Sequence, residues 1–497
     1  MSSDSAPPPA ILEYLPYLPE EPAIWLVGGI PRDQLLGRVS RDFDFVVAGE
    51  ARALARRFAD QLGAAYYALD RERDIGRVIL TGGEKDRITF DFARLRGTTI
   101  EDDLRDRDFT INAIAVRLSA PYTWIDPLGG ARDVKEKVVK ACSSHSLADD
   151  PVRALRAIRF ALSFEFQIAD ETREGIVRVK GTLGSVSFER IRDELMQICR
   201  MPHPGKAFRL LDYMGILDSL FPELGAIREI DFPAAEDINA LEHTLAVVDR
   251  LGDLLTVLDP VHDPQAAGNL LWAEVALRLG RFRNPLADHL ARYLSQANQT
   301  RQLLFFAAIC HTAGLSGGVN SETPYLVGNT EAVNSARIAG AIGRRMRLSN
   351  AGVDLVERIV RHQGTFEGLG FEQLPSPRAI YRFFRTTRGA GVEVIMLALA
   401  SFIGARAARL SQDRWAQRVE LARALLEAFF ENRRRVVDPP QLIDGDDIMR
   451  VLHLEPGPVV GELLEVVREA QAAAEVATRS EALTVARETY DAWERSA

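Results

Sequence analysis

The chain contains 497 residues, and because a single hydrophobic core seldom grows beyond about 250 to 300 residues, we expect about three domains. Apolar residues make up 47% of the sequence and charged residues 26%, a globular mixture that excludes a disordered chain. The net charge of −9 argues against a protein coated in nucleic acid, since phosphate contacts need clustered Lys and Arg; any such site must be local.

The N-terminus and the cysteines indicate a cytoplasmic protein without a membrane anchor. Residues 1–10 are rich in Ser and Pro and lack the basic start and apolar core of a secretory signal, so we interpret residues 1–20 as a short disordered tail. The three cysteines lie far apart without C-x-x-C spacing, which supports neither a disulfide framework nor a zinc ribbon and fits a reducing compartment. Residues 392–405 are strongly apolar but too few to span a bilayer, and predict a buried helix.

Residues 21–140 alternate between strand-like and helix-like patterns. Apolar runs and period-two alternation predict strands, while Ala, Leu and Phe at helical spacing predict a helix after the second of them. This pattern is typical of a small α/β domain. The strands are expected at 24–27, 43–47, 78–80 and 88–92, and the helix at 50–62.

From Pro151 onward strand signals nearly vanish, and amphipathic segments separated by Gly, Pro or Asp predict an all-helical body. Three basic clusters in this part are candidate RNA contacts, although each taken singly is typical of a solvated helix face. They are Arg153, Arg156 and Arg159; Arg382, Arg385 and Arg388; and Arg433, Arg434 and Arg435.

Asp42 and Asp44 form a D-x-D pair in the second predicted strand. Residues two apart in a strand point to the same face, so both carboxylates can reach one ion. Adjacent carboxylates repel unless a cation neutralises them, and Mg²⁺ suits one or two carboxylates together with substrate phosphates. A bare D-x-D is common on protein surfaces, so the pair indicates a catalytic site only if the neighbouring residues support one.

Those surroundings favour phosphate chemistry. Gly28 and Gly29 directly follow the first predicted strand, where a glycine backbone can bend sharply and present N–H groups to phosphate oxygens. Arg32 supplies a permanent charge that matches phosphate geometry. Asp91, in another strand pattern, offers the third carboxylate wanted near an attacking hydroxyl, although a surface strand residue would look the same.

The ordered run from Gly28 through Leu35-Leu36-Gly37 to Asp44 resembles the first motif of the nucleotidyltransferase superfamily. Specifically, it is similar to bacterial class II CCA tRNA nucleotidyltransferases and poly(A) polymerases, with Pro31 where Val is usual. The resemblance implies an α/β nucleotidyltransferase head of the polymerase-β-like kind, followed by a large all-α body. It also implies that Asp42 and Asp44 hold two Mg²⁺ ions, that Gly28, Gly29 and Arg32 contact the triphosphate, and that Asp91 is the third catalytic carboxylate.

Residues 104–113 resemble the family's R-R-D-F-T-x-N-A motif, with Asp106 in place of the first Arg. This implies that Arg107 contacts phosphate and that Asp108 contacts the ribose hydroxyls. Residues 126–133 are similar to a D-P-x-G-G-x-x-D turn of the family, but an ordinary Pro-Gly turn explains them almost equally well.

Residues 149–160 combine an acidic start with arginines at three-residue spacing. Asp149 or Asp150 can cap a helix with Pro151 in its first turn, which would leave a solvated Arg stripe. Asp150 and Arg153 could instead form a planar set of donors and acceptors for the Watson–Crick edge of a base. The segment resembles the family's E-D-x-x-R motif, which implies that the nucleotide pocket is lined by Asp150, Arg153, Arg156 and Arg159.

His243, His311-Thr312 and His362 follow an order that resembles HD-type phosphohydrolase domains, with Thr312 at the key Asp position. A hydroxyl is a poor substitute for an anionic ligand beside imidazoles. We therefore expect a degenerate HD-like region that serves as a helical scaffold.

Together these motifs predict template-independent addition of C or A to the 3′ end of tRNA from CTP and ATP with Mg²⁺, maturing or repairing the CCA terminus. Only residues 97–100 separate Arg96 from Glu101, where full CCA-adding members usually carry a longer flexible loop that helps the switch from CTP to ATP. The short loop suggests a CC-adding specialist. A-only addition, poly(A) synthesis, an HD-type phosphohydrolase and a non-catalytic RNA-binding protein remain alternatives, and the oligomeric state stays open.

The expected organisation has five parts. They are a disordered tail (1–20), the nucleotidyltransferase catalytic domain (21–140), a helical nucleotide-recognition neck (141–225), a helical body with the degenerate HD-like region (226–437) and a C-terminal helical tRNA-binding region (438–497).

Overall fold

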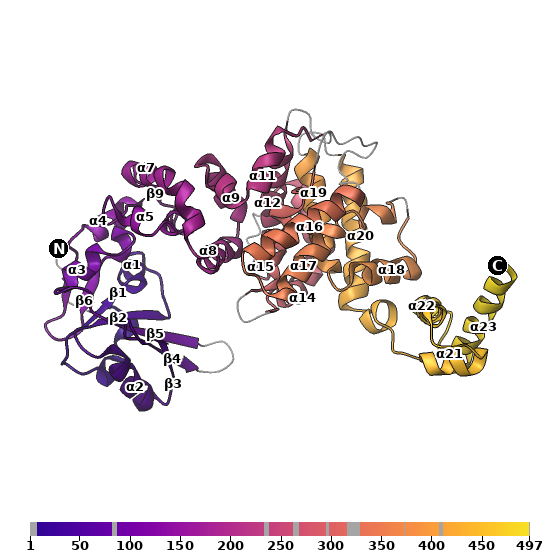
Figure 1. The fold of residues 1–497 in the computed structure, drawn as a ribbon, viewed down its shortest axis with the longest axis horizontal. Coiled ribbons are helices and arrows are strands. Elements are labelled where there is room, and N and C mark those ends of the chain that lie inside the picture. The colour runs from indigo at the N-terminus through magenta and orange to yellow at the C-terminus, as the bar shows by residue number, and fades with distance from the viewer. Residues whose placement is uncertain are drawn as a thin grey trace. The chain divides into compact units, whose positions relative to one another are not determined.

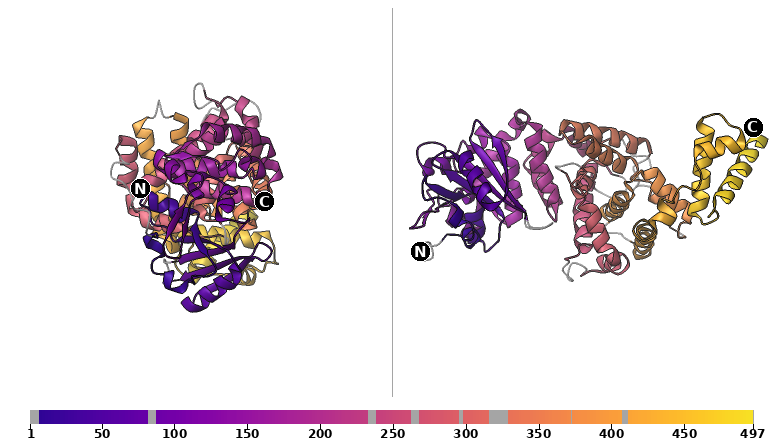
Figure 2. Two further views of the ribbon diagram at one scale, coloured as in Figure 1. Left: turned by 90° about the vertical axis from the view of Figure 1, so that its left-hand side faces the viewer. Right: turned by 90° about the horizontal axis from the view of Figure 1, so that it is seen from below.

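The computed structural model describes residues 7–81, 87–232, 238–261, 268–294, 298–315, 329–371, 373–406 and 411–496. The chain divides into two compact units: Met1–Glu194 with Tyr213–Ser219, and Leu195–Asp212 with Leu220–Ala497. The strands lie in the indigo to purple part of the ribbon, whereas the part from magenta to yellow is drawn as helices (Figure 1; Figure 2). The predicted α/β head is therefore confirmed, and so is a largely helical body. Among the described residues after Pro151, the exception is the two-residue strand β9 Gln167–Ile168, which pairs with β8 Val138–Val139.

A seven-stranded sheet forms the centre of the first unit, in the order β3-β4-β5-β2-β1-β6-β7. Strands β2 and β5 are parallel, and the other neighbouring pairs are antiparallel. All four predicted strands are present. The bounds are β1 Ile24–Val27, β2 Asp42–Val47, β3 Ala65–Asp70, β4 Ile75–Thr81, β5 Arg87–Arg94, β6 Ala115–Arg117 and β7 Thr123–Ile125.

The packing of β2 decides where its carboxylates point. Phe43 and Phe45 are buried on one face of the sheet, and their rings stack on phenylalanines of β5 with centroids 5.1 and 4.6 Å apart. Helix α2 (Ala51–Leu62) covers this face, so Asp42 and Asp44 must project from the other one. A shift of β2 by one residue relative to its neighbours would bury the carboxylates and expose the phenylalanines. The aromatic core therefore fixes the register of the strand.

The N-terminal segment differs from the prediction of a disordered tail over residues 1–20. From residue 7 the chain is ordered, with two 3₁₀ turns at Pro9–Ile11 and Leu15–Tyr17. Ile11 and Tyr14 are buried in the aromatic core of the head, where the Tyr14 ring packs edge-on against two phenylalanines. Apolar burial outweighs the Pro-rich composition here, and residues 1–6 lie outside the described part of the chain.

The junction after the head also differs in detail from the sequence prediction. Helix α5 (Ser146–Asp149) ends before Asp150, and α6 (Arg153–Phe164) begins after Val152 without a side-chain cap. Neither Asp149 nor Asp150 caps α6, because its N-cap position is Val152; the Asp150 carboxylate accepts a hydrogen bond from Arg190. The other helices of this unit include α1 Gly29–Leu35, α3 Ile100–Arg105, α4 Gly130–Glu136 and α7 Asp170–Val179, and α8 Phe188–Arg200 begins in it.

The second unit is helical. Helix α19 (Gly391–Arg406) is the buried helix predicted at 392–405, with Val392, Ile395 and Leu399 fully buried. Its other helices are α9 Pro204–Tyr213, α11 Pro222–Ala226, α12 Ala240–Val257, α13 Leu270–Leu279, α14 Arg283–Leu290, α15 Thr300–Cys310, α16 Asn329–Arg345, α17 Asn350–Arg361, α18 Pro377–Thr387, α20 Gln412–Phe430, α21 Gly445–Leu452, α22 Pro458–Ala472 and α23 Arg479–Ser496. Short α10 (Ile216–Leu220) lies at the division between the units.

Within the described ranges, no single helix has the length and apolar character to cross a membrane. Helix α18 and the Gly391–Gly404 part of α19 meet that requirement only as a pair bent by 97°. Helices α21 to α23 build a small core of their own around Ile448, Leu463 and Ala486. Apart from the N-terminal tail, the division of the chain into these parts stays a prediction.

Candidate active site

The sheet brings the three predicted carboxylates together. In the parallel pairing of β2 with β5, Asp44 lies directly opposite Asp91, and Asp42 lies two positions earlier opposite Thr89. All three therefore stand on the face away from the phenylalanine core. This adjacency is the geometry that a shared ion-binding and reaction centre requires.

Asp44 is held in an electrostatically unfavourable place. Burial raises its pKa to about 6; the Arg107 guanidinium opposes this rise, whereas Asp91 and Asp42 add to it. Gly28 adopts φ +73°, and a Cβ there would lie 2.7 Å from Asp44 Oδ2. Only glycine leaves space for the carboxylate and permits this backbone conformation.

The carboxylates fit a hard divalent cation. Asp42 and Asp44 offer oxygen ligands, and the raised pKa of Asp44 shows that its charge lacks full compensation. No group of three His, Cys, Asp or Glu side chains in the described residues forms a ready-made ion site. Both carboxylate oxygens of Asp91 accept hydrogen bonds from Arg77 at 2.7 Å.

Arg77 is a site residue that the sequence reasoning missed. It lies opposite Asp91 in the antiparallel pairing of β4 with β5 and makes a two-point ion pair with it. The strand pattern around residues 78–80 was visible, but the register that places Arg77 beside Asp91 depends on packing of the whole sheet.

The glycine turn and Arg32 are placed beside the carboxylates but are internally engaged. Helix α1 begins at Gly29, directly after Gly28. Arg32 is only 8% exposed, donates hydrogen bonds to Asp33 and Asn112, and lies over the Phe164 ring at 4.3 Å. Its contact with a triphosphate stays a prediction, because the structure shows its guanidinium tied to protein groups.

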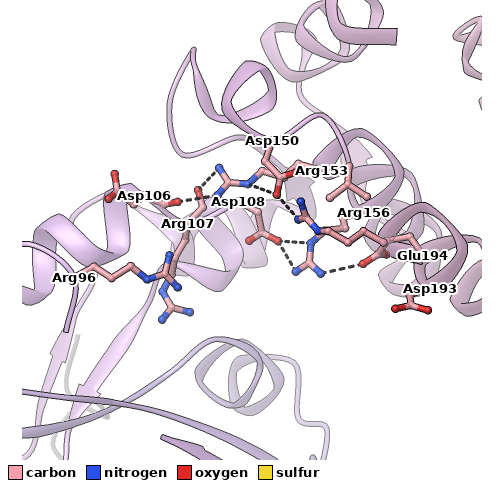
Figure 3. A pocket seen from close by; sticks show the side chains of 11 residues that line it. Arg96, Asp106, Arg107, Asp108, Asp150, Arg153, Arg156, Asp193 and Glu194 are labelled. Carbon is pink, nitrogen blue, oxygen red and sulfur yellow. Dashed lines mark hydrogen bonds and ion pairs between the residues drawn. The ribbon is translucent and has the colours of Figure 1, made fainter. Parts of the chain in front are cut away.

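A cavity of about 380 Å³ opens next to this centre, within the first unit (Figure 3). Five arginines and five carboxylates line it, so it is highly polar without a large net charge. Besides Val152, its lining residues are Arg96, Arg107, Arg153, Arg156, Arg190, Asp106, Asp108, Asp150, Asp193 and Glu194. Its volume lies within the range of about 300 to 1,000 Å³ that is usual for small-molecule sites.

Arg153 is fixed by backbone oxygens. It donates hydrogen bonds to the Asp106 carbonyl at 2.9 Å and to the Ser146 carbonyl at 3.2 Å, and its Nε lies 3.9 Å from Asp150 (Figure 3). Asp150 also accepts from Arg190 at 2.6 Å. Asp150 and Arg153 thus lie close together, and Arg190 joins them, while their reading of a base stays a prediction.

Arg156 and Arg159 diverge in the structure. Arg156 lines the cavity and pairs with Asp108 at 2.6 Å and with Glu194 at 3.0 Å (Figure 3). Burial alone would raise the pKa of Asp108, but Arg156 and the hydrogen bond from Asn112 lower it. Arg159 instead pairs with Glu194 at 2.7 Å and does not line the cavity.

Sequence reasoning also missed Arg96, Arg190, Asp193 and Glu194 as cavity residues. Arg190 and Glu194 lie one turn apart on α8, so both can face α6. The packing of α8 against the cavity is a tertiary contact, which no local sequence pattern predicts.

The HD-like residues lie in the second unit. His243 and His311 are fully buried with ring centroids 5.5 Å apart, and the Thr312 hydroxyl contacts the Thr244 hydroxyl. Burial lowers the pKa of His243 and lowers that of His311 to about 4, so both rings are neutral at pH 7. His362 is only half-buried and lines a different cavity.

Comparisons with known proteins agree with this geometry. The family model "Poly A polymerase head domain" matches residues 24–140, and the model "Probable RNA and SrmB- binding site of polymerase A" matches residues 165–227. The CC-adding tRNA nucleotidyltransferase of Geobacter sulfurreducens is 32% identical over 458 residues, covering 92% of this chain and 90% of its own. The A-adding tRNA nucleotidyltransferase of Deinococcus radiodurans is 32% identical over 474 residues, covering 94% and 95%.

Solved structures share the fold. A CCA-adding enzyme in complex with ATP matches with a TM-score of 0.59 at 21% identity, over 94% of this chain and 91% of that one. The Thermotoga maritima CCA-adding enzyme complexed with tRNA matches with a TM-score of 0.57 at 21% identity, over 98% and 97%.

A mixed sheet with adjoining carboxylates, an arginine-lined cavity and a helical body define a nucleotidyltransferase with a polymerase-β-like head. The chain belongs to the class II CCA tRNA nucleotidyltransferase and poly(A) polymerase family. It is therefore an enzyme of tRNA 3′-end processing, in a family that generally uses a divalent metal.

Proposed function

We propose that this enzyme adds two C residues from CTP to the 3′ end of tRNA, with Mg²⁺ as its metal, and leaves the terminal A to another enzyme. The proposal concerns which nucleotides are added within the CCA terminus. Its nearest competitors are addition of the terminal A alone and addition of the whole CCA sequence.

The turn between β5 and α3 carries this proposal. The strand ends at Arg94 and the helix begins at Ile100, so little chain is left for a flexible loop. A capping box closes the turn: the Thr99 hydroxyl accepts from the Asp102 N–H at 3.3 Å, and the Asp102 carboxylate accepts from the Thr99 N–H at 3.2 Å. A closed, short turn beside Arg96 supports one fixed nucleotide preference rather than a switch from CTP to ATP.

The names of relatives give further support. Besides the Geobacter protein, CC-adding enzymes of Synechocystis and Thermus thermophilus are 27% and 26% identical, and each comparison covers more than nine-tenths of this chain. The relatives called multifunctional CCA proteins match only about half of it, as for Pasteurella multocida with 46%.

A second candidate, A-only addition, is favoured by one observation. The A-adding enzyme of Deinococcus radiodurans is as identical to this chain as the Geobacter enzyme, at 32%. Overall identity to these two relatives therefore does not separate the two activities, and the choice of C over A rests on the further CC-adding relatives from Synechocystis and Thermus thermophilus.

Each cluster of residues has a distinct task in the proposed reaction. Asp42 and Asp44 would hold Mg²⁺, which when bound stabilises negative charge on the reacting phosphate oxygens. Asp91 lies beside Asp44 and pairs with Arg77. Once this ion pair opens, the Asp91 carboxylate can accept the proton of the attacking 3′-hydroxyl. The α-phosphate gains a bond to the 3′-oxygen and loses its bond to pyrophosphate, without a covalent enzyme intermediate.

The cavity residues would choose and orient the nucleotide. Asp150 presents acceptors and Arg153 presents donors at one edge of the cavity, a combination that can pair with a base edge. The anchoring of Arg153 on backbone carbonyls keeps this edge in place. Asp108, kept ionised by Arg156, can accept from ribose hydroxyls.

The test is a matrix of substrates. Transcripts of one tRNA that end before the first C, after one C or after both C residues are each offered CTP or ATP alone, and products are resolved to single nucleotides. We expect two, one and no added C, respectively, and no added A on any end. Addition of A after both C residues would instead show that the enzyme adds the whole CCA sequence or the terminal A. Long A tails would show poly(A) synthesis.

A further inference from the structure

The second unit contains a cavity of about 1110 Å³ to which the proposed reaction assigns no role. It lies among α17, α18, the end of α20 and a π-helical turn at Arg433–Val437, all within the same compact unit. Five arginines line it together with three carboxylates and His362. The arginines are Arg358, Arg361, Arg385, Arg388 and Arg433.

Three of these arginines lack a carboxylate partner. Arg361, Arg388 and Arg433 are exposed, and none forms a side-chain hydrogen bond or ion pair with any residue in the described part of the chain. Arg358 and Arg385, in contrast, pair with Asp354 at 3.1 Å and with Glu465 at 3.0 Å. Three uncompensated guanidinium groups therefore face one cavity in a chain whose net charge is −9.

The carboxylates of the cavity offset this charge only in part. Asp354 pairs with Arg358 and Glu357 pairs with Arg344 at 3.0 Å. The third carboxylate, Asp438, forms no ion pair among the described residues, so three unpaired guanidinium groups stand against one unpaired carboxylate. The pKa of half-buried His362 reflects this positive charge. Burial lowers the pKa most, and the nearby Arg361, Arg388 and Arg358 lower it further. The cavity is thus a local region of positive potential.

Two of the basic clusters recognised in the sequence converge here. In the first, Arg382 and Arg385 are bound by Glu469 and Glu465 of α22, which leaves Arg388 for the cavity. Arg388 ends α18 at φ +48°, a left-handed conformation that disfavours a side chain by about 1 kcal/mol or more. The second cluster contributes Arg433, which lies over the Phe429 ring at 5.0 Å.

We propose that this cavity is a second RNA site, which binds backbone phosphates of the tRNA substrate through Arg361, Arg388 and Arg433. The identity of the RNA rests on the proposed function. The three charges come from three separate elements and are exposed rather than enclosed, an arrangement that suits successive phosphates of a strand. The volume also exceeds the range of about 300 to 1,000 Å³ that is usual for a single small molecule.

The experiment compares tRNA binding by two variants of the full chain that lose the same charge. The cavity variant combines Arg361→Gln, Arg388→Gly and Arg433→Gln, with glycine at 388 because φ is positive there. The control combines Arg292→Gln, Arg337→Gln and Arg414→Gln, which are exposed in the same unit but do not line the cavity. Dissociation constants are measured with an unmodified tRNA transcript at several salt concentrations.

We expect the cavity variant to bind tRNA roughly tenfold or more weakly, and the slope of log affinity against log salt to fall by about 2, since each phosphate contact contributes about 0.7 to 0.9. The KM for tRNA should rise while kcat and the KM for CTP stay unchanged. Restoring charge with Arg361→Lys, Arg388→Lys and Arg433→Lys should recover much of the affinity, because a point charge suffices for phosphate.

Equal tRNA binding by the cavity variant and the control would overturn the inference. So would loss of binding to free CTP or inorganic phosphate with unchanged binding to tRNA, since the cavity would then hold a small anion. The substrate matrix described above separates this outcome from failure of the proposed function. If the wild-type chain adds nucleotides to tRNA but the cavity variant binds tRNA as the control does, only the second RNA site is refuted.

Discussion

At the scale of single residues, the site depends on neighbours that sequence separates widely. Asp42, Asp44 and Asp91 were predictable because each sits in a recognisable strand pattern, and the sheet places them as expected. Arg77 and Arg190 were not, because a strand register and a helix packing decide their places. Local patterns thus predicted these carboxylates but not the arginines that pair with Asp91 and with Asp150.

The raised pKa of Asp44 gives a prediction about stability. The folded protein holds the Asp44 proton up to a pH of about 6, whereas the unfolded chain releases it near 3.8. The folded state therefore loses stability as the pH rises from about 4 through 6, and ionised Asp44 destabilises it above that range. Asp44→Asn should stabilise the metal-free protein by about 1 to 2 kcal/mol at pH 7.5, after allowance for partial solvent access.

Thermal melting in excess EDTA tests this at pH 7.5 and near pH 4. The gain from Asp44→Asn should shrink to a small fraction at the lower pH, where the folded state keeps the proton and the unfolded chain still carries it about half of the time. Asp60→Asn, an exposed change on α2, serves as the control and should have little effect at either pH. A lower melting temperature for Asp44→Asn at pH 7.5, or a gain independent of pH, would contradict the assignment of strain to this carboxylate.

At the scale of elements, periodicity predicted the strands and the buried helix α19, but it failed where tertiary packing competes with local signals. Residues 7–20 are ordered because Ile11 and Tyr14 join the head core, although their composition indicates disorder. Asp150 does not cap α6, whose N-cap position is Val152, and its carboxylate binds Arg190 of α8. In each case a contact distant in sequence outweighs the local preference.

The closed turn before α3 allows a test of nucleotide choice. Thr99→Ala removes the cap and should lower stability by about 1 kcal/mol. If the closed turn restricts the enzyme to C, the freed segment should also raise AMP incorporation relative to CMP, measured with both nucleotides at equal concentration.

Ser349→Ala is the matched control, because Ser349 caps α17 in the second unit by the same kind of hydrogen bond. It should cost similar stability and leave nucleotide choice unchanged. An identical ratio of CMP to AMP in both variants would show that the cap at Thr99 stabilises the fold without restricting the nucleotide.

At the scale of the whole molecule, positive and negative side chains are balanced in one cavity and unbalanced in another. The chain carries a net charge of −9, and the cavity of the first unit balances five arginines with five carboxylates, whereas the cavity of the second unit keeps three arginines unpaired among the described residues. An acidic enzyme can thereby hold RNA at defined places without binding it everywhere. Net charge alone could not reveal this, because it sums over surfaces that the fold separates.

The measurement that tests the central claim most directly is incorporation of labelled CTP into a tRNA transcript that lacks its CCA end. Asp42→Asn and Asp44→Asn are compared with wild type and with Asp60→Asn in saturating Mg²⁺. Since metal stabilisation of a transition state is worth several kcal/mol, each site variant should lose about a hundredfold to a thousandfold or more in rate, while Asp60→Asn keeps the wild-type rate. Wild-type incorporation by Asp42→Asn or Asp44→Asn would contradict the account.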